Sequence, residues 1–128
     1  MNKTIGLSEG EWKIMKCLWH EAPQTITQLV AALKAKTAWS KHTVISMLSR
    51  MEAKGAVYHK EGERAKQFYP ALHREDVATA EAENFLSKVY DGSLGLMVNA
   101  MVREKALSKE EIQELYEILK KAEKGIER

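Results

Sequence analysis

Cysteine, proline and long apolar runs are all scarce in this sequence of 128 residues. The one cysteine, Cys17, excludes an internal disulfide and any cysteine-rich metal cluster, and its apolar neighbours in the chain favour a small buried side chain there. No apolar run is as long as a membrane span, and the first residues lack the basic and apolar regions of a signal peptide. We therefore expect a cytoplasmic protein that does not insert into a membrane.

Catalytic and metal-binding patterns are also missing. The four histidines are scattered over different predicted elements, and none has the spacing of an HxxxH or HExxH motif. There is no glycine-rich phosphate loop and no hydrolase nucleophile elbow. The sequence thus predicts no catalytic residue, no metal site and no cofactor, and it argues against an enzyme.

The net charge of +2 conceals an asymmetry along the chain. Residues 1–72 carry 11 Lys and Arg against 6 Asp and Glu, a net charge of +5, whereas residues 73–128 carry 9 against 12, a net charge of −3. A basic first half suits a polyanionic partner, and an acidic second half suits solubility and contact with protein. Charge alone does not distinguish DNA from RNA. The length fits one ordinary domain, or a small domain with a helical extension.

Two capping boxes predict the first two helices. In one, Ser8 and Glu11 each satisfy a free backbone amide of the other, and Thr25 and Gln28 repeat the pattern further along. They predict a first helix that runs to about residue 20 and a short second helix that follows the break at Pro23.

A third helix is predicted between the N-cap Ser40 and the stop at Gly55. Its apolar residues fall on one side, which we expect to face the core: Val44, Met47, Leu48 and Met51. The opposite side is small, hydroxylic and basic, with no acidic residue before Glu52. This profile indicates a surface that approaches a negatively charged partner, although an ordinary solvated surface is the alternative.

A β-hairpin is predicted after the third helix. The β-favouring pairs Val57–Tyr58 and Phe68–Tyr69 flank a charged tip with a central glycine. Three helices followed by a hairpin are typical of a winged helix-turn-helix, in which the hairpin is the wing. The predicted fold class is therefore mainly α with a small β-hairpin wing: a winged helix-turn-helix DNA-binding domain over residues 1–72, followed by a helical dimerisation domain over residues 73–128.

The predicted DNA-binding residues lie on the third helix and on the wing. The helix would enter the major groove of double-stranded DNA with its amino end toward the bases, and the wing would hold the backbone or reach the minor groove. Solvation or ion pairing is the alternative for Arg50 and Lys66, and packing against the wing or a helix is the alternative for Ile45. The candidates are Lys41, His42, Thr43, Ile45, Ser46, Ser49 and Arg50 on the helix, and Arg64 and Lys66 on the wing.

Apolar helices make up the second half of the chain. Helices are predicted over about residues 75–90, 93–102 and 108–126, and the middle one is hydrophobic almost all round, so we expect it to be buried on several sides. Stacking on a second copy explains this excess of apolar surface, and packing against the winged helix is the alternative. The predicted dimer interface comprises Phe85, Leu86, Val89, Leu94, Leu96, Met97, Met101, Ile112, Leu115, Leu119 and Ala122.

A resemblance to a known family extends over nearly the whole chain. Through the segments LSEGEWKIMKCLW, WSKHTVISMLSRMEAKG, YPAL, FLSKVYDGSLGLMV and LSKEEIQELYEIL, the sequence resembles the penicillinase and methicillin-resistance repressors, which are related to the copper-responsive repressors. The resemblance implies a homodimer that binds a palindromic operator and represses resistance and sensor genes. In β-lactam-responsive members it implies a membrane-bound zinc metalloprotease sensor and cleavage of the repressor within its carboxy-terminal helices.

Three departures from the family pattern bear on what the resemblance implies. The paired Cys-x-Cys motifs of the copper-responsive members are absent, which disfavours copper sensing. Ala100 and Met101 align with the Asn-Phe pair at which the β-lactam repressors are cut, so cleavage between them is a hypothesis. Lys41 and Ile45 replace residues that are often Pro and polar in relatives, so no operator sequence is transferred. The alternative functions are a winged-helix protein-interaction module, an activator, and a constitutive regulator without proteolytic induction.

Overall fold

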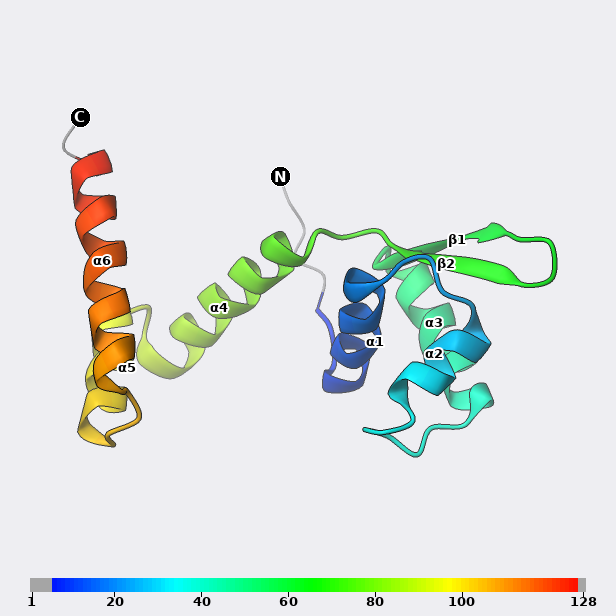
Figure 1. The fold of residues 1–128 in the computed structure, drawn as a ribbon, viewed down its shortest axis with the longest axis horizontal. Coiled ribbons are helices and arrows are strands. Elements are labelled where there is room, and N and C mark those ends of the chain that lie inside the picture. The colour runs from blue at the N-terminus through cyan, green and yellow to red at the C-terminus, as the bar shows by residue number, and fades with distance from the viewer. Residues whose placement is uncertain (1–5, 127–128) are drawn as a thin grey trace. The chain divides into compact units, whose positions relative to one another are not determined.

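The computed structural model describes residues 6–126, which fold into helices and one hairpin in the predicted order (Figure 1). The chain forms two compact units, here called the first and the second unit in chain order. The boundary between them lies inside the fourth helix, between Glu81 and Ala82. The functional division into residues 1–72 and 73–128 stays a prediction. The elements are α1 (Glu9–His20), α2 (Ile26–Leu33), α3 (Lys41–Ala53), β1 (Val57–Glu61), β2 (Lys66–Pro70), α4 (Arg74–Tyr90), α5 (Leu94–Arg103) and α6 (Lys109–Ile126).

Both predicted capping boxes are present. The Ser8 hydroxyl accepts from the Glu11 amide at 3.2 Å, while the Glu11 carboxylate accepts from the Ser8 amide at 2.9 Å. Thr25 and Gln28 make the same reciprocal pair, at 3.2 and 2.8 Å. The first two helices therefore begin where the sequence indicates, because these side chains satisfy amides that lack a partner within the helix.

The end of α3 is fixed by Gly55. Its φ of 86° lies in the left-handed region, which residues with a Cβ adopt only at a cost. The amides of Gly55 and Ala56 then donate back to the carbonyls of Glu52 and Met51, at 3.1 and 2.8 Å. This Schellman motif closes α3 and sends the chain directly into β1.

The core of the first unit lies between α1, α2, α3 and the hairpin. The apolar side of α3 faces it as predicted, since Val44, Met47, Leu48 and Met51 are all buried. The remaining core side chains come from the neighbouring elements: Ile14, Met15, Leu18, Leu29, Leu33, Ala56, Val57 and Phe68. The outer side of α3 is consequently turned away from the core, where it is free to meet a partner.

Gln24 forms an isolated β-bridge to β2 that the sequence did not indicate. Its backbone exchanges two hydrogen bonds with Phe68 of β2, at 3.1 and 2.9 Å. Its buried side-chain amide donates to the carbonyls of Cys17 and Glu21, at 3.0 and 2.7 Å. One residue thus ties the end of α1 to the wing.

A buried carboxylate, that of Glu11, is held by a lysine from the end of α3. Glu11 is 4% exposed, and its Oε1 lies 2.7 Å from the ammonium of Lys54, which also donates to the Gly6 carbonyl at 2.9 Å. Burial acts to raise the pKa of Glu11, but the hydrogen bonds from Lys54 and Ser8 outweigh it, so the pKa lies below its ordinary value of 4.5. This ion pair fastens α1 to α3.

The Glu11–Lys54 pair gives a pH-dependent contribution to stability. Because the pKa of Glu11 is lower in the folded than in the unfolded chain, this contribution is complete above the unfolded-state pKa and is lost as the pH falls through the folded-state value. We expect Lys54→Met to lower the free energy of unfolding at neutral pH by about 1 to 3 kcal/mol and to flatten its decline with acid. Urea denaturation at a series of pH values measures both effects.

Lys34→Met is the matched control, because Lys34 is exposed and makes no ion pair with a described residue. If both variants show the same decline with acid as the unaltered chain, the lowered pKa of Glu11 does not contribute to stability.

The second unit has a different character, because none of the residues 82–126 is buried. The expectation that the α5 segment is buried on several sides is wrong for the single chain, in which Leu94 is 55% and Leu96 53% exposed. The physical reason is that α6 and the part of α4 that belongs to this unit are the only other helical segments described in it, and they cannot cover an apolar surface that extends almost all round α5.

Candidate nucleic-acid interface

The amino end of α3 is open and positively charged. Ser40 caps it, with its hydroxyl accepting from the Thr43 amide at 3.2 Å, and the exposed Lys41 and His42 form the first helical residues. The Thr43 hydroxyl lies 3.2 Å from the Ser40 hydroxyl, so it belongs to the cap and is half-buried. The free amides and the positive end of the helix dipole make this turn suited to phosphate.

The outer side of α3 is exposed over its length. Ser46, Ser49 and Arg50 are all exposed, and Ile45 is 41% exposed. None of the described acidic side chains lies within ion-pair distance of Arg50. This side therefore offers hydroxyls, an apolar branch and a free guanidinium, which are groups that read base edges, thymine methyls and phosphates.

The acidic residue of α3, Glu52, contacts a histidine of the wing. The sequence reasoning missed this contact. The Glu52 carboxylate lies 2.7 Å from Nδ1 of His59 on β1, and the His59 ring packs against Phe68 with centroids 5.6 Å apart. Glu52 is thus tied to the base of the wing, and the same contact fixes the wing relative to α3. The spacing of the sequence gave no signal for this pair, because it depends on how β1 turns back along α3.

The hairpin presents different residues on its two faces. Its antiparallel register pairs His59 with Phe68 and Tyr58 with Tyr69, and cross-strand partners share a face. The face with Phe68 closes the core, whereas the two tyrosines stack on the other, with centroids 5.1 Å apart and the Lys60 ammonium 5.2 Å from the centroid of the Tyr69 ring. This stack stiffens the wing as a projection from the first unit.

The tip of the wing carries Arg64 and Lys66, both exposed as predicted. A tight turn closed by a 3.1 Å hydrogen bond from the Gly62 amide to the Ala65 carbonyl separates the strands. The tip also holds exposed Glu61 and Glu63, so its net charge is less positive than the two basic residues alone indicate. Like α3, the tip has cationic side chains available for a backbone contact.

The predicted dimer interface lies on exposed helix faces of α4, α5 and α6. Leu86, Met97 and Leu115 are half-buried. Among the rest, Phe85, Val89 and Leu119 are between 50% and 63% exposed. Exposed apolar side chains this dense mark an interaction surface.

An apolar groove of about 480 Å³ lies between α5 and α6. Predicted residues on α6, Ile112, Leu115 and Leu119, line it together with Val98 and Val102 of α5. The sequence reasoning missed the two valines, because their position opposite the α6 seam depends on the turn between the helices. A helix face of matching shape would fill this groove.

The hypothetical cleavage pair lies inside α5. Ala100 is half-buried and Met101 is 41% exposed, and both have helical backbone. Because proteases bind extended segments, cutting here requires the last turns of α5 to open.

Other kinds of site have little support in the part of the chain that the structure describes. Within residues 6–126, no three His, Cys, Asp or Glu side chains are grouped to hold a metal ion. No helix in that range is long and apolar enough to cross a membrane.

Comparison with known proteins gives concordant matches. The model of the family described as penicillinase repressor matches residues 7–121. The methicillin resistance regulatory protein MecI of Staphylococcus aureus strain N315 is 29% identical over 120 residues, which span 94% of this chain and 98% of MecI. The penicillinase repressor of Bacillus licheniformis is 34% identical over 120 residues, which span 93% of each chain.

Two solved structures bear on the fold. The solution structure of the Bacillus licheniformis BlaI monomeric form in complex with the blaP half-operator is 28% identical and has a TM-score of 0.52, covering 59% of this chain and 93% of the chain in that structure. A mutant of MarR from E. coli complexed with operator DNA is 16% identical with a TM-score of 0.52, covering 91% of this chain and 75% of MarR, and shows the fold alone. These likenesses confirm the predicted winged-helix fold.

Proposed function

The chain belongs to the penicillinase repressor family of DNA-binding transcriptional repressors, and on that premise we propose that it represses transcription as a homodimer bound to a palindromic operator. A repressor family is not an enzyme class. The observation that carries the proposal is the exposed, acid-free outer side of α3, from Lys41 to Arg50, together with the exposed Arg64 and Lys66 on the wing. In the BlaI structure, the relative of similar fold is bound to a half-operator.

The geometry of the first unit supports a division of roles on DNA. The α3 helix lies in the major groove, where Ser46 and Ser49 meet bases or phosphates and Ile45 meets a thymine methyl. Arg50 and the wing residues Arg64 and Lys66 hold the backbone, which sets register without reading sequence. The contact between Glu52 and His59 supports this arrangement, because it keeps the wing in place beside α3.

Dimerisation through the second unit supplies the second half-site. One subunit of this size reads a few base pairs, and operator symmetry mirrors the two-fold symmetry of a dimer. The exposed apolar side chains of α4, α5 and α6 and the groove between α5 and α6 support a second copy as the partner. Linking two half-site contacts multiplies occupancy, so loss of the dimer is an effective means of release.

Footprinting on the DNA upstream of its own gene, across a series of salt concentrations, tests the proposal directly. Protection of a two-fold sequence, with affinity that falls steeply as salt rises and a particle mass of two chains, is the expected result. No protection by a folded dimer, there or in a genome-wide binding selection, would indicate that the winged helix serves as a protein-interaction module.

The wing contributes measurably to the salt dependence. We expect the double substitution Arg64→Ala and Lys66→Ala to weaken operator binding and to reduce the slope of log affinity against log salt by about two units, one for each phosphate that the wing no longer neutralises. Substituting Lys88 and Lys121, exposed lysines of the second unit, is the charge-matched control. An unchanged slope in the wing variant would show that Arg64 and Lys66 do not contact the DNA phosphates.

We further propose that proteolysis within α5 releases the repressor from DNA, and that a membrane-bound metalloprotease sensor is the partner that starts this release. We expect cleavage between Ala100 and Met101 to separate α6 from the rest of the chain, which destroys the groove lined by both helices. Incubation with the cognate protease, followed by mass spectrometry, checks this. Intact peptides across Asn99 to Val102 would leave a repressor that is induced by another route.

A further inference from the structure

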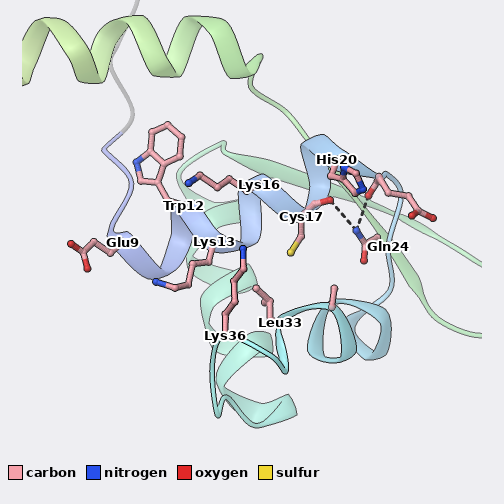
Figure 2. Close-up of a pocket in the computed structure, with 11 residues that line it drawn as sticks. Glu9, Trp12, Lys13, Lys16, Cys17, His20, Gln24, Leu33 and Lys36 are labelled. Carbon is pink, nitrogen blue, oxygen red and sulfur yellow. Dashed lines mark hydrogen bonds between the residues drawn. The ribbon is translucent and has the colours of Figure 1, made fainter. Parts of the chain in front are cut away.

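A second pocket lies in the first unit, between α1 and the end of α2 (Figure 2). Its volume is about 580 Å³, which is within the range of small-molecule sites. It is formed by residues that the proposed DNA and dimer surfaces do not use. The proposed function therefore leaves its chemistry unexplained.

The floor of this pocket is apolar. It is formed by the buried Leu33 of α2 and by the thiol of Cys17, which is half-buried rather than buried as the sequence suggested, and the exposed Ala32 lines the pocket beside Leu33. Burial raises the pKa of the Cys17 thiol, and the nearby Lys36 ammonium offsets part of this rise. At neutral pH the floor thus offers an uncharged thiol and aliphatic carbons, which suit the flat face of an apolar group.

The rim of the pocket is cationic. Lys13 and Lys16 of α1 and Lys36 after α2 line it, and Figure 2 shows the Lys36 side chain directed toward the α1 side. In the part of the chain that the structure describes, none of the three lies within ion-pair distance of a carboxylate. The acidic lining residues, Glu9 and Glu21, lie at the two ends of α1 and leave the middle of the rim positive.

We propose that this pocket binds a small organic anion, a molecule with a flat apolar body and a carboxylate or a similar anionic group. The apolar body lies on the floor between Cys17 and Leu33, and the anionic group meets the ammonium groups of Lys13 and Lys36. Because α2 packs on both α1 and α3, the ligand contacts the helix that supports the DNA-facing helix.

The single cysteine makes the test simple, because Cys17 is the one thiol in the chain. The rate at which iodoacetamide alkylates Cys17 is measured with increasing 1-naphthoate, and with 1-naphthamide and 1-naphthylmethylammonium as neutral and cationic analogues. We expect saturable slowing with the anion and weaker protection with both analogues. No slowing by 1-naphthoate, or equal protection by the cationic analogue, would overturn the proposal.

Variants and a second measurement separate binding from folding. Lys13→Gln with Lys36→Gln is expected to raise the dissociation constant of 1-naphthoate about tenfold by calorimetry, whereas Lys88→Gln leaves it unchanged. In the unaltered chain, the amide shifts caused by 1-naphthoate in NMR spectra should gather on α1 and the end of α2. Shifts confined to α5 and α6, or a double variant with unchanged affinity, would contradict the assignment.

Discussion

A chain carrying Leu119→Glu is expected to be a folded monomer and to lose between about 100-fold and 10,000-fold in affinity for a two-fold operator. Leu119 is 63% exposed in the single chain and lines the groove between α5 and α6. A carboxylate there lowers the stability of the folded single chain little, because the position is solvated. In a dimer the same carboxylate would be buried without a partner, which costs several kcal/mol.

The matched control for Leu119→Glu is Gln113→Glu, which adds the same charge to α6 at an exposed position outside the groove. Sedimentation equilibrium gives the mass of each variant, and titration by footprinting gives the operator affinity. The monomer should still occupy an isolated half-site weakly, because its α3 and wing are intact. A Leu119→Glu dimer of normal stability, or a monomer with undiminished operator affinity, would contradict the role of this surface.

The elements of the first unit were predictable because the signals that define them are local. Ser8, Thr25 and Ser40 cap helices through contacts three residues away, and Gly55 ends α3 through its own backbone angle. The periodicity of α3 likewise separates its buried side from its exposed side without reference to other elements. These features determine which residues face outward, and so most of the candidate site.

The features that could not be predicted depend on segments distant in the chain. Gln24 pairs with Phe68, and Lys54 reaches Glu11, only after α1, α3 and β2 have packed together. The cationic pocket has the same origin, because Lys36 meets the α1 residues only in the folded unit. In the single chain the burial of α5 was predicted wrongly for a related reason, since hydrophobic content shows that a surface needs a cover but not where the cover comes from.

The substitution Ser46→Glu is expected to weaken operator binding about 100-fold while leaving stability almost unchanged. Ser46 is exposed in the middle of the outer side of α3, which contains no acidic residue before Glu52. A carboxylate there faces the DNA phosphates, and such a like-charge contact costs several kcal/mol, where each 1.4 kcal/mol is a factor of ten. Glutamate is a good helix former, so the substitution does not destabilise the helix itself.

Two companion variants show which property of position 46 matters. Ser46→Ala removes the hydroxyl without adding charge, and we expect it to weaken binding by only about fivefold, the worth of one hydrogen bond of roughly 1 kcal/mol. Ser87→Glu adds the same charge to the exposed part of α4 in the second unit and should leave the affinity unchanged. Fluorescence anisotropy on the footprinted operator measures all three. If Ser46→Glu and Ser87→Glu bind alike, DNA does not meet α3 on this side, and the hydroxylic, acid-free surface of the helix requires a different partner.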